Sequence, residues 1–147
     1  MIMKESSEKP MNKQRTRDDY VWLAQQFLDV SDARDDVLAL LTDDIQFSFP
    51  KWGTVRGKAR LLQFFQDMSQ HVAAMSHPAE HRRFIVDGPL VCVEGLTQGQ
   101  MQNGKTWNAG RFSTVYEFDG DLIKRIDIYT DPDMTDETRE NYPWLRR

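Results

Sequence analysis

"YEFDGDLIKRIDIYTDPD", residues 116–133, holds an apolar strand among acidic residues and contains two signals that decide the fold. Asp119-Gly120 is typical of a tight turn between antiparallel strands, and Pro132 ends the second strand. Six carboxylates accompany these strands: Glu117, Asp119, Asp121, Asp127, Asp131 and Asp133. Because neighbouring side chains in a strand point to opposite faces, alternation predicts whether these acids line a site or cover its outside.

Alternation divides the side chains of this hairpin into an inner and an outer set. Over residues 111–118 the inner set carries rings and a hydroxyl: Phe112, Thr114, Tyr116 and Phe118. In the last strand the inner set is Ile126, Ile128 and Thr130, and the outer set is Arg125, Asp127 and Tyr129. Most of the acids are therefore expected on the outer face, in the turn or past the strand's end. A β-bulge, which Gly110 or Gly120 would permit, reverses the order beyond it.

The chain before Pro78 predicts three helices and one strand. Thr16 and Asp19 form the pattern of a capping box for a first helix, and a second, shorter helix starts at Ser31 or Asp32. A long third helix presents one apolar face: Leu61, Phe65, Met68, Val72 and Met75. Between the second and third helices, "DDIQFSFP" (43–50) alternates as a strand and "KWGTVRG" (51–57) is expected to be a loop.

After Pro78 the pattern is that of β-strands. Residues 81–88 and 90–101 predict two strands, and Asn103-Gly104 predicts a hairpin that leads into residues 105–118. Three N-terminal helices packed on a strongly curved, mostly antiparallel sheet give an α+β fold. The 147 residues suit one domain and show no internal repeat.

Charge and composition exclude several classes of protein. A net charge of -4 with a pI near 5.3 provides no basic surface for nucleic acid. No apolar run approaches the roughly 20 residues that cross a bilayer, and residues 1–15 lack the apolar centre of a signal peptide. We expect a cytoplasmic protein that binds neither membranes nor nucleic acid, in which the single Cys92 is a structural residue of a buried strand.

The order of elements, with "LALLTDDIQFSFP", the glycine in "VRGKARLLQFF" and "YEFDGDLIKRIDIYTDPD", resembles the nuclear transport factor 2-like superfamily in its SnoaL-like, ketosteroid-isomerase-like branch. The resemblance covers residues 16–133, which leaves a flexible N-terminal tail at 1–15 and a C-terminal extension at 134–147. It implies a cone whose open end leads to an apolar pocket between the concave sheet and the helices.

Many members of this superfamily pair through the convex face of the sheet. The resemblance thus implies a homodimer in which the outer set of the last strand forms the contact: Arg125, Asp127 and Tyr129. Simple solvation of these side chains is the alternative.

Three enzyme patterns of the superfamily place catalytic groups at positions that this chain fills otherwise. The base and oxyanion donors of ketosteroid isomerase fall on Phe49, Ala24 and Thr114. The charged residues of limonene epoxide hydrolase fall on Gly95, Thr97 and Ile128, and the acid of the polyketide cyclases falls among Ile126, Ile128 and Thr130. The acid–base residues of these families are therefore expected to be absent.

The expected pocket lining combines hydrocarbon with hydroxyl and amide groups. Its members are Gln46, Ser48, Phe49, Trp52, Gly95, Thr97, Phe112, Thr114, Tyr116, Ile126, Ile128 and Thr130. Such a lining suits a small, apolar ligand with one or two oxygen atoms. Gly95 and Gly99 either widen the cavity or permit a bend in a curved strand.

No cofactor or metal is expected. No phosphate-binding loop or nucleotide fingerprint is present, and Pro78 breaks the helical spacing that would let His77 and His81 share a metal ion.

Three functions remain open. The first is a domain that binds a small, oxygen-bearing, largely apolar molecule. The second is an isomerase, cyclase or hydrolase that uses Tyr116 with Asp131 or Asp127 as its acid. The third is a protein-interaction module without a usable cavity.

Overall fold

The computed structural model describes residues 14–135; nearly all of the predicted N-terminal tail and of the predicted C-terminal extension lies outside this range. The elements, in chain order, are α1 (Arg17–Asp32), the 3₁₀-helix η1 (Val37–Leu40), β1 (Leu41–Phe49), β2 (Gly53–Arg56), α2 (Lys58–Ser69), β3 (Val72–Ser76), the 3₁₀-helix η2 (Ala79–His81), β4 (Arg83–Asp87), β5 (Leu90–Met101), β6 (Thr106–Asp119) and β7 (Leu122–Thr130). Neither α-helix in this range has the length and apolar composition of a membrane span.

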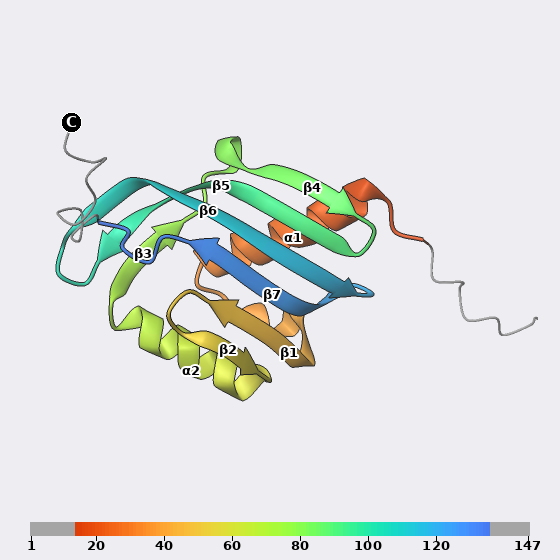
Figure 1. Ribbon diagram of the computed structural model, residues 1–147, viewed down its shortest axis with the longest axis horizontal. Helices are drawn as coiled ribbons and strands as arrows, with labels where there is room; N and C mark the ends of the chain where they lie inside the picture. Colours follow the sequence, from red (N-terminus) through yellow and green to blue (C-terminus); the bar gives the residue numbers. More distant parts are fainter. Residues whose placement is uncertain (1–13, 136–147) are drawn as a thin grey trace, which may run out of the picture.

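Seven strands form one strongly curled sheet with two helices against it (Figure 1). The strand order is β2-β1-β7-β6-β5-β3. Strand β4 lies outside this order and also pairs with β5. Strand β1 runs parallel to β7, and all other pairs are antiparallel. Helix α1 packs against β4 and β5, while α2 packs against β1, β2 and β3. The predicted α+β class is confirmed.

The prediction of three helices is wrong. Helix α1 continues to Asp32, and Arg34 then takes a left-handed backbone conformation (φ 55°) that ends it. The side chain of Asp36 caps only a short 3₁₀ turn, Val37–Leu40, before β1 begins. The described residues thus hold two α-helices.

The predicted third helix is too long. It ends at Ser69, and Val72 and Met75 belong to β3, which pairs with β5. The edge of β5 offers backbone partners to residues 72–76, and this pairing overrides their helical spacing. The expected loop 51–57 likewise contains the short strand β2, paired with the end of β1.

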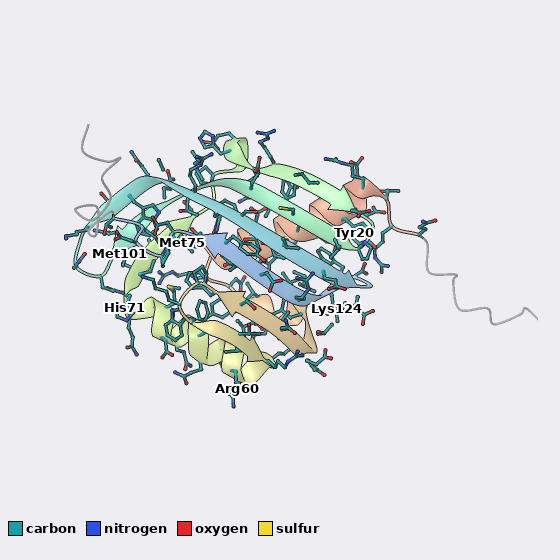
Figure 2. The ribbon with its side chains drawn as sticks, in the orientation of Figure 1. Tyr20, Arg60, His71, Met75, Met101 and Lys124 are labelled. Carbon is teal, nitrogen blue, oxygen red and sulfur yellow. The ribbon has the colours of Figure 1, made fainter. Side chains whose placement is uncertain are left out.

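The turn and cap predictions are confirmed. The hydroxyl of Thr16 accepts a hydrogen bond from the N–H of Asp19, whose carboxylate accepts one from the N–H of Thr16. Gly104 and Gly120 have φ values of 89° and 61° in the β5–β6 and β6–β7 turns. Figure 2 shows His71 and Met101 at the same end of the molecule, where the His71 carbonyl accepts a hydrogen bond from the N–H of Gln102.

The inner set predicted for residues 111–118 is buried in full. In β7 a register shift places Glu117 opposite Arg125 but Phe118 opposite Ile123, so Lys124 is an extra residue (labelled in Figure 2). Because of this bulge, Ile123 and Ile126 both face the core, and the predicted alternation holds from Ile126 onward.

Candidate functional site

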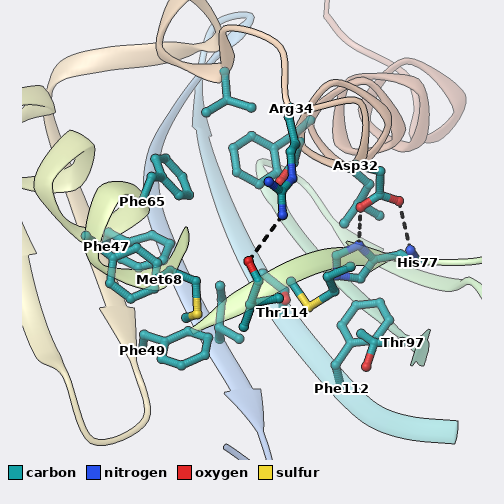
Figure 3. Close-up of a pocket in the computed structure, with 18 of the residues that line it drawn as sticks. Asp32, Arg34, Phe47, Phe49, Phe65, Met68, His77, Thr97, Phe112 and Thr114 are labelled. Atoms are coloured by element: carbon teal, nitrogen blue, oxygen red, sulfur yellow. Dashed lines mark hydrogen bonds and ion pairs between the residues drawn. The ribbon is translucent and has the colours of Figure 1, made fainter. Parts of the chain in front are cut away.

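A cavity of about 460 Å³ lies between the concave face of the sheet and the segments α1, η1 and α2. Its wall is largely aromatic and aliphatic (Figure 3). The rings of Phe47 and Phe64 lie 4.7 Å apart, and Phe49 lies 5.2 Å from Phe64, so one side of the cavity is a cluster of tilted rings. Met68 and Met75 add flexible hydrocarbon.

Seven of the twelve residues expected in the lining border this cavity: Phe49, Thr97, Phe112, Thr114, Tyr116, Ile128 and Thr130. Gln46 and Ser48 do not, because they lie on the opposite face of β1, where the Ser48 hydroxyl is 2.8 Å from that of Thr54. Ile126 is fully buried in the core, and Trp52 is 45% exposed, with its ring edge against Phe64.

The glycines of β5 permit close packing. A Cβ at Gly95 would lie 2.9 Å from the carbonyl oxygen of His81. A Cβ at Gly99 would lie 2.2 Å from the carbonyl oxygen of Ala74 and 2.5 Å from the ring of Trp107. Neither glycine borders the main cavity, so close approach rather than a wider cavity accounts for them.

A histidine and an aspartate meet in the cavity wall. Asp32, in the last turn of α1, places Oδ1 2.6 Å from Nδ1 of His77, just after β3 (Figure 3). Its Oδ2 accepts a hydrogen bond of 2.8 Å from the backbone N–H of His77. Both side chains border the cavity and are only 17% and 12% exposed. Sequence reasoning considered His77 only as a metal ligand with His81.

This geometry defines the tautomer of the neutral His77 ring. Because a carboxylate only accepts hydrogen bonds, the contact assigns the proton to Nδ1, and the neutral ring then carries its lone pair on Nε2. No described residue forms a hydrogen bond with Nε2. The ring is held edge-on to Phe112, 4.7 Å between centroids. A histidine oriented by a carboxylate in this way has the arrangement of a general base.

Arg82 lies behind this pair and is 5% exposed. Its Nε donates to the carbonyl oxygen of His77 and its Nη1 to Oδ1 of Asp29, each at 2.8 Å. Its Nη2 is 3.6 Å from Oδ2 of Asp32.

Tyr116 borders the same cavity and is almost completely buried. Burial raises the pKa of its phenol far above the ordinary value, and a hydrogen bond with Thr114 and the charge of Arg82 oppose the rise only in part. Tyr116 therefore stays neutral and keeps its proton available for donation.

The two acids that the sequence paired with Tyr116 lie elsewhere. Asp127 is on the outer face, in an ion pair with Arg125. Asp131 follows the end of β7 and accepts a hydrogen bond from the N–H of Asp133. Neither borders the cavity.

The outer face carries a network of charges. Nε of Arg125 donates to Glu117 at 2.8 Å, and this contact and Lys124 hold the pKa of Glu117 below its ordinary value. Tyr129, the third residue of the expected dimer face, is 61% exposed on this side of the sheet. Within residues 14–135 no three His, Cys, Asp or Glu side chains gather as a metal site would require.

The family model of the SnoaL-like domain matches residues 24–126. Three solved structures share the fold. An NTF2-like protein from Burkholderia xenovorans LB400 is 25% identical, with a TM-score of 0.65 over 80% of this chain and 92% of its own. A protein of Pseudomonas putida KT2440, provisionally named a polyketide cyclase, is 20% identical, with a TM-score of 0.69 over 78% of this chain and 93% of its own. TerC, co-crystallised with polyporic acid, is 19% identical, with a TM-score of 0.68 over 76% of this chain and 91% of its own. None of the curated proteins matches significantly.

Proposed function

Because the chain belongs to the family of SnoaL-like domains, we propose that its cavity binds a small, largely apolar, oxygen-bearing molecule and that His77 removes a proton from it. The observation that carries this proposal is the 2.6 Å contact between Nδ1 of His77 and Oδ1 of Asp32 in the cavity wall. Without this pair, the lining would support binding alone.

The size and chemistry of the cavity support one class of substrate. Its volume of about 460 Å³ suits a molecule of one to three rings, and the Phe47, Phe49 and Phe64 cluster favours a flat, unsaturated one. Thr114 and Tyr116 supply hydroxyl groups for one or two oxygen atoms. A ketone with an acidic hydrogen on the adjacent carbon fulfils these conditions.

The proposed step is proton abstraction next to a carbonyl. Nε2 of His77 takes the proton, the electron pair of the C–H bond moves into the carbonyl group, and an enolate forms. Asp32 stabilises the imidazolium, and the neutral phenol of Tyr116 donates a hydrogen bond to the enolate oxygen. Return of the proton to another carbon completes an isomerisation. Alternatively, the enolate carbon attacks a second carbonyl and closes a ring, and the alkoxide that forms takes the proton back from Nε2 of His77.

Binding without turnover is the second candidate. The positions that carry charged catalytic residues in the related enzyme patterns hold Phe49, Gly95, Thr97, Thr114 and Ile128 here, which favours it. The third hypothesis, an interaction module, expected no cavity and is not proposed further.

Deuterium exchange tests the proposal. β-Tetralone, an apolar two-ring ketone, is incubated with the protein in D₂O, and loss of its α-proton signals is followed by NMR. We expect exchange above the buffer rate, and His77→Gln lowers it by about 100-fold or more, as general-base catalysis requires. His81→Gln is the matched control, because His81 is half exposed. Binding of β-tetralone without exchange would favour the second candidate, and neither binding nor exchange would contradict both.

A further inference from the structure

Arg82 is a nearly buried cation next to the proposed base. An arginine at 5% exposure has lost most of its hydration and needs acceptors in the protein. It has three: the carboxylates of Asp29 and Asp32 and the carbonyl oxygen of His77. The neighbouring Arg83 is 81% exposed and forms an ion pair with Glu94 at the surface.

These contacts join two segments that are distant in the sequence. Asp29 and Asp32 belong to the last turn of α1, while His77 lies between β3 and η2. Arg82 holds the helix through both carboxylates and the β3–η2 connection through the His77 carbonyl. The planar guanidinium makes these contacts in three directions at once, which a lysine ammonium on a flexible stem does not reproduce.

The charges around His77 are compatible with its proposed role as a base. Asp29, Asp32 and Arg82 sum to one negative charge when His77 is neutral. A proton on His77 makes the cluster neutral. The two carboxylates therefore outweigh the positive charge of the arginine beside the proposed base.

We propose that Arg82 is a positioning residue: it fixes Asp32 and the backbone of His77 so that the ring keeps its proton on Nδ1 and presents Nε2 to the cavity. The catalytic purpose of this role rests on the proposed function. The positioning itself does not, because the tautomer of His77 exists without substrate. Oδ2 of Asp32 connects Arg82 to the backbone of His77. It lies 2.8 Å from the backbone nitrogen of His77 and 3.6 Å from Nη2 of Arg82.

Long-range ¹H–¹⁵N NMR of the substrate-free protein tests this role. The chain has three histidines, so His71 and His81 serve as internal references. We expect a single tautomer of His77 with Nδ1 protonated in the wild type and in Arg83→Gln. In Arg82→Gln and in Arg82→Lys the two tautomers of His77 exchange, and its signals broaden or average, while the other histidines do not change.

Arg82→Lys keeps the buried charge and provides the test if Arg82→Gln fails to fold. A pure Nδ1–H tautomer in a folded Arg82 variant would overturn the proposal. The β-tetralone assay separates the two ideas: we expect Arg82→Lys to lower kcat by roughly 10-fold or more with little change in KM. Averaged tautomers in a variant that retains the wild-type kcat would also overturn the catalytic purpose of Arg82. If the wild type does not catalyse deuterium exchange of β-tetralone, that result contradicts the proposed function alone.

Discussion

The carboxylate of Asp32 lies 2.6 Å from Nδ1 of His77, although 45 positions separate the two residues in the chain. The end of α1 and the end of β3 meet at the cavity wall and bring them together. A paired carboxylate and imidazole that border a mostly apolar cavity are costly to desolvate, and this cost supports the proposal that chemistry, rather than packing, determines the residue types here.

The first prediction compares two aspartates of one helix. Asp32→Asn removes the charge that both His77 and Arg82 contact, and we expect it to lower the free energy of unfolding by about 1–3 kcal/mol. Asp29→Asn changes a carboxylate that is 60% exposed, and we expect a loss below about 1 kcal/mol. Urea unfolding measures both. Equal losses would mean that the contacts of Asp32 add no more stability than those of Asp29.

Much of the fold follows from local patterns. Asn103-Gly104 and Asp119-Gly120 form the hairpin turns because their glycines adopt positive φ at no steric cost. Strict alternation from Phe112 to Phe118 gives the correct inner face. The helix prediction failed at Val72 and Met75 because the edge of β5, distant in sequence, offers these residues hydrogen bonds that no local pattern contains.

The site was harder to predict because its two polar partners meet only in the folded chain. One signal was available: Asp32 follows Ala24 and Leu28 at intervals of four, so it continues the buried stripe of α1. A carboxylate on the apolar face of a helix requires a partner. The identity of that partner, His77, depends on how β3 pairs with β5, which the sequence does not reveal.

Tyr116→Phe gives the second prediction. The substitution removes the donor to the enolate oxygen, and we expect β-tetralone exchange to fall by about 100-fold while the protein stays folded. Unchanged exchange would remove Tyr116 from the mechanism. Tyr129→Phe, on the exposed outer face, is the control.

The third prediction concerns alkaline pH. The pKa of Tyr116 is raised in the folded protein, whereas in the unfolded chain it is near the ordinary 10.0. The unfolded state therefore loses its proton first, and stability falls as the pH rises above about 10. Because Tyr116→Phe eliminates this linkage, we expect its stability to decline less steeply with pH than that of the wild type. Urea midpoints between pH 8 and 11 measure the slope, and parallel curves would contradict the assignment.

Gly99→Ala gives the fourth prediction. The added Cβ would lie 2.2 Å from the carbonyl oxygen of Ala74 and push β3 away from β5. We expect a loss of about 1–3 kcal/mol in urea unfolding, as for overpacked cores, and faster amide exchange in β3. Exchange of β-tetralone falls as well, because β3 leads directly to His77. Gln98→Ala, at an exposed neighbouring position, is the control, and equal stability of the two variants would contradict the close-approach argument.

The outer face of the sheet gives the last prediction, that two copies of the chain pair there. Tyr129 is 61% exposed beside the ion pairs of Arg125 with Glu117 and Asp127. A twofold axis would place the positive group of one copy against the negative groups of the other. We expect native mass spectrometry to show a dimer, and Tyr129→Glu to dissociate it because the new carboxylate adds repulsion next to Asp127. Trp22→Glu alters an equally exposed aromatic residue on α1 and leaves the dimer intact. A single-chain mass for the wild type, or a dimer that survives Tyr129→Glu, would show that this face is only solvated.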